Sequence, residues 1–194
     1  MVEPEGQKII TVVSGLPRSG TSMMMKMLAQ GGMATLTDSI RTRDVHNPEG
    51  YYEYEPVKKL PCGQTEWLDK AAGKAVKIIA GLLEYLPNGY SYKVIFMERH
   101  IEEIVASQQK LLEFRKESMS LGDDKIISTL SEHVRKVKTW LRLKPGVSLL
   151  EVNYNVVLLN PAKVVPLVNK FFGGWLDETA MVNAVRLDLY RNRK

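Results

Sequence analysis

Residues 15–20 read GLPRSG, and the hydroxyl residues Thr21 and Ser22 follow them directly. A glycine at each end of this segment lets the backbone turn tightly and approach a ligand closely. Amide N–H groups and hydroxyls in such a turn suit an anion, and Arg18 adds a guanidinium that remains charged at neutral pH. The segment therefore predicts a phosphate-type site. The alternative is an ordinary turn between a strand and a helix.

The flanking residues are of the kind that would hold such a turn in place. Residues 8–14 are a β-branched run and residues 21–30 are rich in strong helix formers, which is the order strand, turn, helix. The first N–H groups of a helix have no partner inside it and are available to an anion. In a Walker A loop the lysine would stand at position 21; here Thr21 stands there, and the cation is Arg18 within the turn.

A second pair of residues could bind an anion at the same edge of a sheet. The apolar run 92–97 is a predicted strand, Arg99 follows its end, and Ser107 stands eight positions further on. A cation at the carboxyl end of a parallel strand and a hydroxyl about two turns into the next helix can converge on one oxyanion.

Together these motifs resemble those of sulfotransferases that use 3′-phosphoadenosine 5′-phosphosulfate (PAPS). PRSGTS resembles their 5′-phosphosulfate loop, and Arg99 with Ser107 resembles their 3′-phosphate pair. Residues 149–173 are similar to the strand, tyrosine and helices near the end of that family. The resemblance covers about half of the chain. It implies PAPS as cosubstrate, no metal, and a P-loop nucleoside triphosphate hydrolase-like (sulfotransferase) fold.

The resemblance also assigns roles to individual residues. Arg18 would stabilise charge on the sulfate. The base is expected to be Asp38, twenty residues after Arg18 as in the carbohydrate branch, or His46, since the cytosolic branch uses a histidine; Asp44 and Glu53 rank below them. The alternatives are that Asp38 is a turn or cap residue and His46 an exposed loop residue. The residues expected to bind the cofactor are Pro17, Arg18, Ser19, Gly20, Thr21, Ser22, Arg99, Ser107 and, unless the basic end of the chain is only solvated, Arg191.

The whole chain of 194 residues predicts a single α/β domain. Strands that alternate with helices indicate a three-layer α/β/α sandwich around a mainly parallel sheet of about five strands. Residues 37–55 are polar and irregular but carry tyrosines at positions 51, 52 and 54, so we interpret them as an active-site loop or lid. The tyrosines would stack on a ligand or close the core.

The amino-acid composition limits which classes of ligand and partner are expected. A net charge of +5 suits a polyanionic ligand, but the basic residues are dispersed and no nucleic-acid-binding signature appears, so we expect no nucleic acid. The single cysteine, Cys62, rules out an internal disulfide and fits a reducing cytoplasm. No run approaches the roughly 18 apolar residues of a membrane span, and we expect a cytoplasmic protein without a membrane partner. The oligomeric state stays open.

The expected function is therefore transfer of a sulfuryl group from PAPS to a hydroxyl or amine of a small molecule or saccharide. One alternative is a P-loop nucleotide kinase or NTPase. Against it stand Thr21 in the Walker lysine position and the run VIFMER, which lacks the terminal aspartate that would hold Mg²⁺. Another alternative is a non-catalytic nucleotide-binding module on the same fold.

Overall fold

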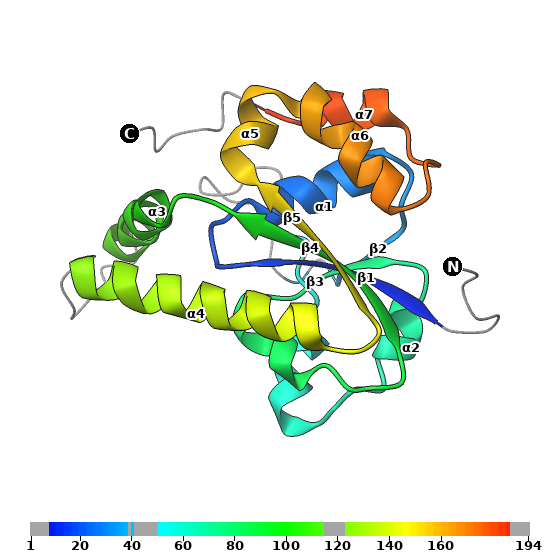
Figure 1. Cartoon of the computed structure of the whole chain (residues 1–194), viewed down its shortest axis with the longest axis horizontal. Coiled ribbons are helices and arrows are strands. Elements are labelled where there is room, and N and C mark those ends of the chain that lie inside the picture. The colour runs from blue at the N-terminus through cyan, green and yellow to red at the C-terminus, as the bar shows by residue number, and fades with distance from the viewer. Residues whose placement is uncertain (1–7, 39, 41–49, 115–122, 187–194) are drawn as a thin grey trace.

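The computed structural model describes residues 8–38, 40, 50–114 and 123–186. They form a five-stranded sheet in which every pairing is parallel, with the strand order β2-β3-β1-β4-β5 (Figure 1). The strands are β1 (Ile9–Gly15), β2 (Thr35–Leu36), β3 (Ala75–Lys77), β4 (Ser91–Glu98) and β5 (Val147–Asn153). Helices cover both faces of the sheet, so the predicted three-layer α/β architecture is confirmed.

One helical layer lies on each face of the sheet (Figure 1). The first layer consists of α1 (Thr21–Gln30), α5 (Tyr154–Leu159), α6 (Pro161–Phe171) and α7 (Glu178–Asn183). The second layer contains α2 (Leu68–Ala71), α3 (Ile101–Phe114), α4 (Asp123–Leu143) and the 3-10 helices η1 (Glu55–Cys62) and η2 (Ala80–Tyr85). Among the described residues, no helix combines the length and the apolar run needed to cross a bilayer.

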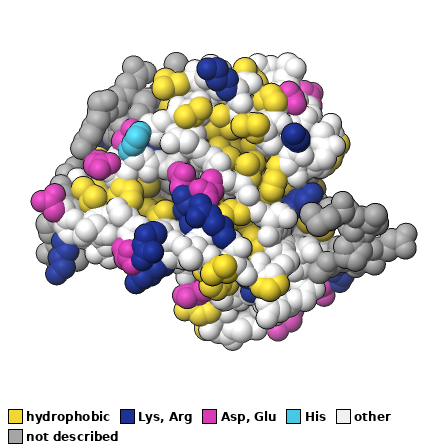
Figure 2. All heavy atoms as spheres, in the orientation of Figure 1, with side chains coloured by type: hydrophobic (Ala, Val, Ile, Leu, Met, Phe, Trp, Pro, Cys, Tyr) yellow, Lys and Arg dark blue, Asp and Glu magenta, His cyan; other side chains and the backbone are white. Residues whose placement is uncertain are grey.

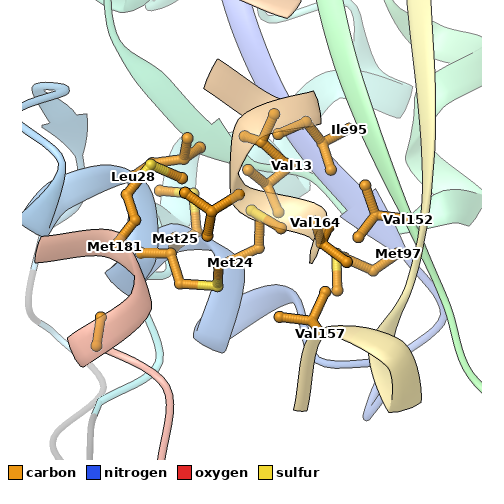
Figure 3. Close-up of a cluster of buried hydrophobic side chains, with 14 of the residues drawn as sticks. Val13, Met24, Met25, Leu28, Ile95, Met97, Val152, Val157, Val164 and Met181 are labelled. Atoms are coloured by element: carbon orange, nitrogen blue, oxygen red, sulfur yellow. The ribbon is translucent and has the colours of Figure 1, made fainter. Parts of the chain in front are cut away.

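The central strand β1 contributes to a core on each face. All its residues after Ile9 are buried, as is usual for parallel strands covered on both sides. Val12 and Val13 point to opposite faces because successive side chains alternate along a strand, and they belong to different core clusters. Figure 3 shows the Val13 cluster, in which Met24 and Met25 of α1 pack against strand residues.

The structure differs from the sequence prediction mainly around β3. The apolar run AVKIIA at residues 75–80 predicts a strand over its whole length, but β3 ends at Lys77 and η2 begins at Ala80. The sequence pattern also missed η1, which begins with a proline at its first turn and contains Pro61. Proline fixes φ near the helical value but removes an N–H donor, which explains a short 3-10 segment where apolar periodicity predicted no helix.

Candidate functional site

The segment between β1 and α1 is a tight turn whose two terminal glycines are both required. A Cβ atom on Gly15 would lie 2.5 Å from the carbonyl oxygen of Met97, and one on Gly20 would lie 2.3 Å from the Tyr154 ring. The φ angles of Gly20 and Arg18 are +97° and +75°, so both lie in the left-handed region. The predicted strand, turn and helix are confirmed, and the turn is held tightly by β4 and α5.

Two serine hydroxyls at this turn are buried without a visible partner. Ser14 and Ser19 are at most 1% exposed, and no hydrogen-bond partner for either hydroxyl lies among the described residues. Buried hydroxyls usually have a partner. Ser19 lies in the turn directly before α1, whose first N–H groups lack intrahelical partners, and this fits a turn that closes around an anion. Ser14 ends β1 on the same face as Val12, away from α1.

The two predicted anion motifs meet in the structure. The Nε atom of Arg18 donates a 3.0 Å hydrogen bond to the hydroxyl of Ser107, 89 residues later in the chain. Gln108 adds a 3.4 Å hydrogen bond from its side-chain amide to the carbonyl oxygen of Pro17. These contacts attach α3 to the turn, so the loop cation and the serine of the second motif lie in one place.

Arg99 lies close to Arg18 and is buried, and its guanidinium group has several protein partners. Its Nε donates to Glu103 at 2.8 Å, and the two side chains are only 7% and 6% exposed. Its Nη1 donates to the carbonyl oxygen of Arg18 at 3.1 Å, and its guanidinium carbon lies 4.6 Å from the centre of the Tyr154 ring. The other oxygen of Glu103 accepts from the Asn155 amide at 2.9 Å. Arg99 therefore connects the turn, α3 and α5.

Lys77 is a second cation at the turn, and the sequence analysis missed it. Its Nζ donates to the hydroxyl of Ser22 at 3.3 Å and to the carbonyl oxygen of Tyr51 at 3.0 Å, and it lies 3.8 Å from a carboxylate oxygen of Glu53. The Lys77 side chain is 10% exposed. The available signal was its position as a lone charge within the otherwise apolar run at residues 75–80.

The carboxylate of Asp38 accepts hydrogen bonds from backbone N–H groups. One of its carboxylate oxygens accepts from the Ile40 N–H at 3.1 Å, and the other accepts from the Glu55 N–H at 2.5 Å. This geometry is the turn or cap arrangement that the sequence left as the alternative. The role of Asp38 as a base stays a prediction.

The tyrosines of the predicted lid pack inward. Tyr51 is 5% exposed, and Tyr54 meets the Trp67 ring edge-on with 5.7 Å between ring centres. Tyr52, with φ +50°, is partly buried and packs against the core cluster that contains Val13. His46 and Arg191 lie outside the described residues, as do residues 39 and 41–49 of the lid.

A cleft of about 340 Å³ lies beside Leu16 and Arg99, at the carboxyl end of β4 and between α3 and α4. Leu16 of the turn, Arg99 and His100 line it together with Ser131 and Val134 of α4. Its volume is in the range of small-molecule sites, and it borders the turn on the side that faces α4.

No family model and no curated protein sequence matches this chain. Solved structures do. Sulfotransferase STF1 from Mycobacterium tuberculosis H37Rv superposes with a TM-score of 0.58 at 15% identity, over 95% of this chain and 74% of that one. The sulfotransferase domain of the Synechococcus PCC 7002 olefin synthase superposes with a TM-score of 0.53 at 17% identity, over 95% and 80%. The fold is that of the sulfotransferases.

A sugar kinase from Janibacter sp. HTCC2649 also matches, at 13% identity over 93% of this chain and 99% of that one, but its TM-score of 0.46 is too low to carry an argument.

Within this sulfotransferase fold, the strand order places the candidate site. β1 has β3 on one side and β4 on the other, so the direction in which strands are added reverses next to β1. Ligands of open α/β sheets bind in the crevice at such a switch point, outside the carboxyl ends of the strands. Arg18, Arg99 and Lys77 follow or end β1, β4 and β3 respectively, and thus surround that crevice.

Proposed function

We propose that this protein is a transferase that moves a sulfuryl group from PAPS to a hydroxyl or amine of a small molecule or saccharide. The observation that carries the proposal is the 3.0 Å contact between Arg18 and Ser107. It joins the phosphosulfate-type turn to the second anion motif at the switch point of a sulfotransferase fold. A nucleotide with anionic groups at both its 5′ and 3′ ends fits two adjoining anion motifs better than one with a single anionic end.

The proposed cofactor site divides between two groups of residues. Residues 17–22 bind the 5′-phosphosulfate through N–H groups, hydroxyls and Arg18. Ser107 and Arg99 bind the 3′-phosphate, with Arg191 as a further contact. Charged hydrogen bonds to phosphate are among the strongest in proteins, and the dipole of α1, a helix of 10 residues, favours negative charge at its N-terminus.

The chemistry is an in-line displacement at sulfur in which the protein positions the reactants and stabilises charge. Arg18, within the turn, contacts Ser107 of α3, which follows β4, whereas Lys77 reaches Ser22 from β3. β3 and β4 flank β1 on opposite sides, so the two cations lie on opposite sides of β1. Two cations stabilise the negative charge that builds up on the sulfuryl oxygens and on the leaving 5′-phosphate. No metal is required for this arrangement.

The kinase or NTPase alternative is disfavoured by two features. Thr21 occupies the position of the Walker lysine. Glu98, the carboxylate at the end of β4, is paired with Lys138 of α4, and this pairing turns it toward α4 rather than toward a metal at the turn.

Ligand-dependent thermal stability tests the proposal. We expect 3′-phosphoadenosine 5′-phosphate to raise the melting temperature, because a ligand at 100 times its Kd adds about 2.7 kcal/mol to the stability of the native state. Adenosine 5′-phosphate, which lacks the 3′-phosphate, is the matched control and should give a smaller shift. A larger shift with Mg-ATP than with 3′-phosphoadenosine 5′-phosphate would contradict the proposal and favour the kinase alternative.

A further inference from the structure

Residues 53–55 are held firmly against residues 37 and 38. The Thr37 hydroxyl and the Asp38 N–H both donate to the carbonyl oxygen of Glu53, at 2.9 Å and 3.2 Å. The Glu55 N–H donates in return to the Asp38 carboxylate at 2.5 Å. With the Ile40 N–H on its other oxygen, Asp38 has a backbone partner on each oxygen. It acts as a clamp on the segment that carries Glu53.

The side chain of Glu53 extends toward the turn. One of its carboxylate oxygens lies 3.8 Å from Lys77 Nζ, and Lys77 Nζ lies 3.3 Å from the Ser22 hydroxyl. The Glu53 side chain is 24% exposed, so it is enclosed but still reachable from solvent. The Lys77 ammonium thus links the Glu53 carboxylate to Ser22, the residue two positions after the phosphosulfate-type turn.

We propose that Glu53 is the base that takes the proton from the acceptor, and that Asp38 is a positioning residue for it. This inference rests on the proposed function. The acceptor oxygen or nitrogen attacks sulfur, and its proton passes to the Glu53 carboxylate. The bond between sulfur and the bridging oxygen breaks, and its electron pair stays on the 5′-phosphate. The products are the sulfated acceptor and 3′-phosphoadenosine 5′-phosphate, and Glu53 returns its proton to solvent.

The two substrates then occupy opposite sides of β1. The nucleotide extends from the turn toward β4, where Arg99 and Ser107 lie. The acceptor approaches over β3 and residues 50–55, where Lys77 and Glu53 lie. A general base must come within hydrogen-bond reach of the proton it removes, and this placement puts a carboxylate next to a cation that borders the transferred group.

Three variants test the inference: Glu53→Gln, Asp38→Asn and, as matched control, Glu55→Gln. Glu55 is a carboxylate two positions away whose side chain pairs with Lys58 at 2.5 Å on the surface. The readout is formation of 3′-phosphoadenosine 5′-phosphate from PAPS, first with water and then with simple phenols, sugars and amines as acceptors. Binding of 3′-phosphoadenosine 5′-phosphate, measured by thermal shift, is followed in parallel.

Glu53→Gln is expected to lower kcat by about 10²- to 10⁴-fold, the contribution of a general base, and to leave nucleotide binding unchanged. It should also abolish the rise in rate with pH that reports deprotonation of the base. Asp38→Asn should lower kcat less and keep that rise, because the base is still present. Glu55→Gln should behave as the wild type.

Three outcomes would contradict the assignment of Glu53 as the base. If Asp38→Asn removes the pH-dependent rise and Glu53→Gln keeps it, Asp38 is the base and the inference is wrong. Wild-type protein that binds 3′-phosphoadenosine 5′-phosphate but never forms it from PAPS also overturns the inference, while leaving a nucleotide-binding function. If 3′-phosphoadenosine 5′-phosphate does not bind at all, the proposed function itself fails, and the inference with it.

Discussion

Arg99 shows how one residue can serve both the structure and the proposed ligand. A buried ion pair recovers its desolvation cost only when the geometry is good and the remaining polar atoms are satisfied. Both oxygens of Glu103 have partners, Arg99 and Asn155, and Arg99 also contacts the carbonyl oxygen of Arg18. Substitution of Arg99 is therefore expected to disturb the turn as well as the proposed 3′-phosphate site.

We predict that Arg99→Ala lowers the free energy of unfolding by about 3 to 5 kcal/mol, because it leaves Glu103 buried without its cation. Urea unfolding measures this. The control is Arg135→Ala, which breaks an Arg–Glu pair of the same 2.8 Å length whose side chains are 68% and 47% exposed; it should have little effect. Adding Glu103→Gln to Arg99→Ala should recover part of the loss. A double variant less stable than Arg99→Ala alone would refute this explanation.

At the scale of elements, the turn keeps its shape because α5 packs on the start of α1. Tyr154, the first residue of α5, fills the space directly beside Gly20 and lies under the Arg99 guanidinium. The helix that follows β5 thus supports the turn that follows β1, even though the two are far apart in sequence.

Gly20→Ala tests this packing. The new methyl group would meet the Tyr154 ring at 2.3 Å in a residue with φ +97°, so we expect both backbone strain and overpacking, at a total cost of about 2 to 5 kcal/mol. Gly73→Ala is the control, since Gly73 has φ +72° and nothing within 4 Å of a Cβ; only the strain of about 1 to 2 kcal/mol should remain. Equal losses of unfolding free energy in the two variants would show that Tyr154 does not restrict this position.

At the scale of the whole molecule, charged contacts attach α4 to the edge of the sheet. Acidic and basic side chains lie next to one another on this face (Figure 2). Lys138 of α4 pairs with Glu98 of β4 and, at 2.8 Å, with Glu151 of β5, and Arg142 also pairs with Glu151. Burial alone would raise the pKa of Glu151, but hydrogen bonds from Lys138 and Arg142 outweigh it and hold the pKa below its ordinary value of 4.5.

This lowered pKa makes global stability depend on pH in a defined direction. A carboxylate with a depressed folded pKa contributes stability above its unfolded pKa and loses it as the pH falls through the folded value. Glu151→Gln should therefore cost about 1 to 2 kcal/mol near neutral pH, and the difference from wild type should shrink below about pH 4.5. Urea unfolding between about pH 7 and pH 3 measures this. A difference that stays constant over that range would contradict the assigned cause.

The sequence by itself determined the local parts of this protein. The β-branched run, the glycine-bounded turn and the helix-forming run fixed the β1-turn-α1 unit, and alternating strands and helices fixed the layer architecture, because backbone propensity and side-chain periodicity act over a few residues. The spacing of Arg99 and Ser107 likewise placed the second motif at a strand end and its following helix.

Only the tertiary structure decided which side chains meet. The contact of Arg18 with Ser107, the buried partner Glu103 of Arg99, and the approach of Lys77 and Glu53 to the turn all depend on strand order and helix packing. Local pattern does not specify these, since the free energy that selects them comes from burying residues distant in sequence against one another. That is why the turn between β1 and α1 was predictable, whereas the contacts that Arg99, Lys77 and Tyr154 make around it were not.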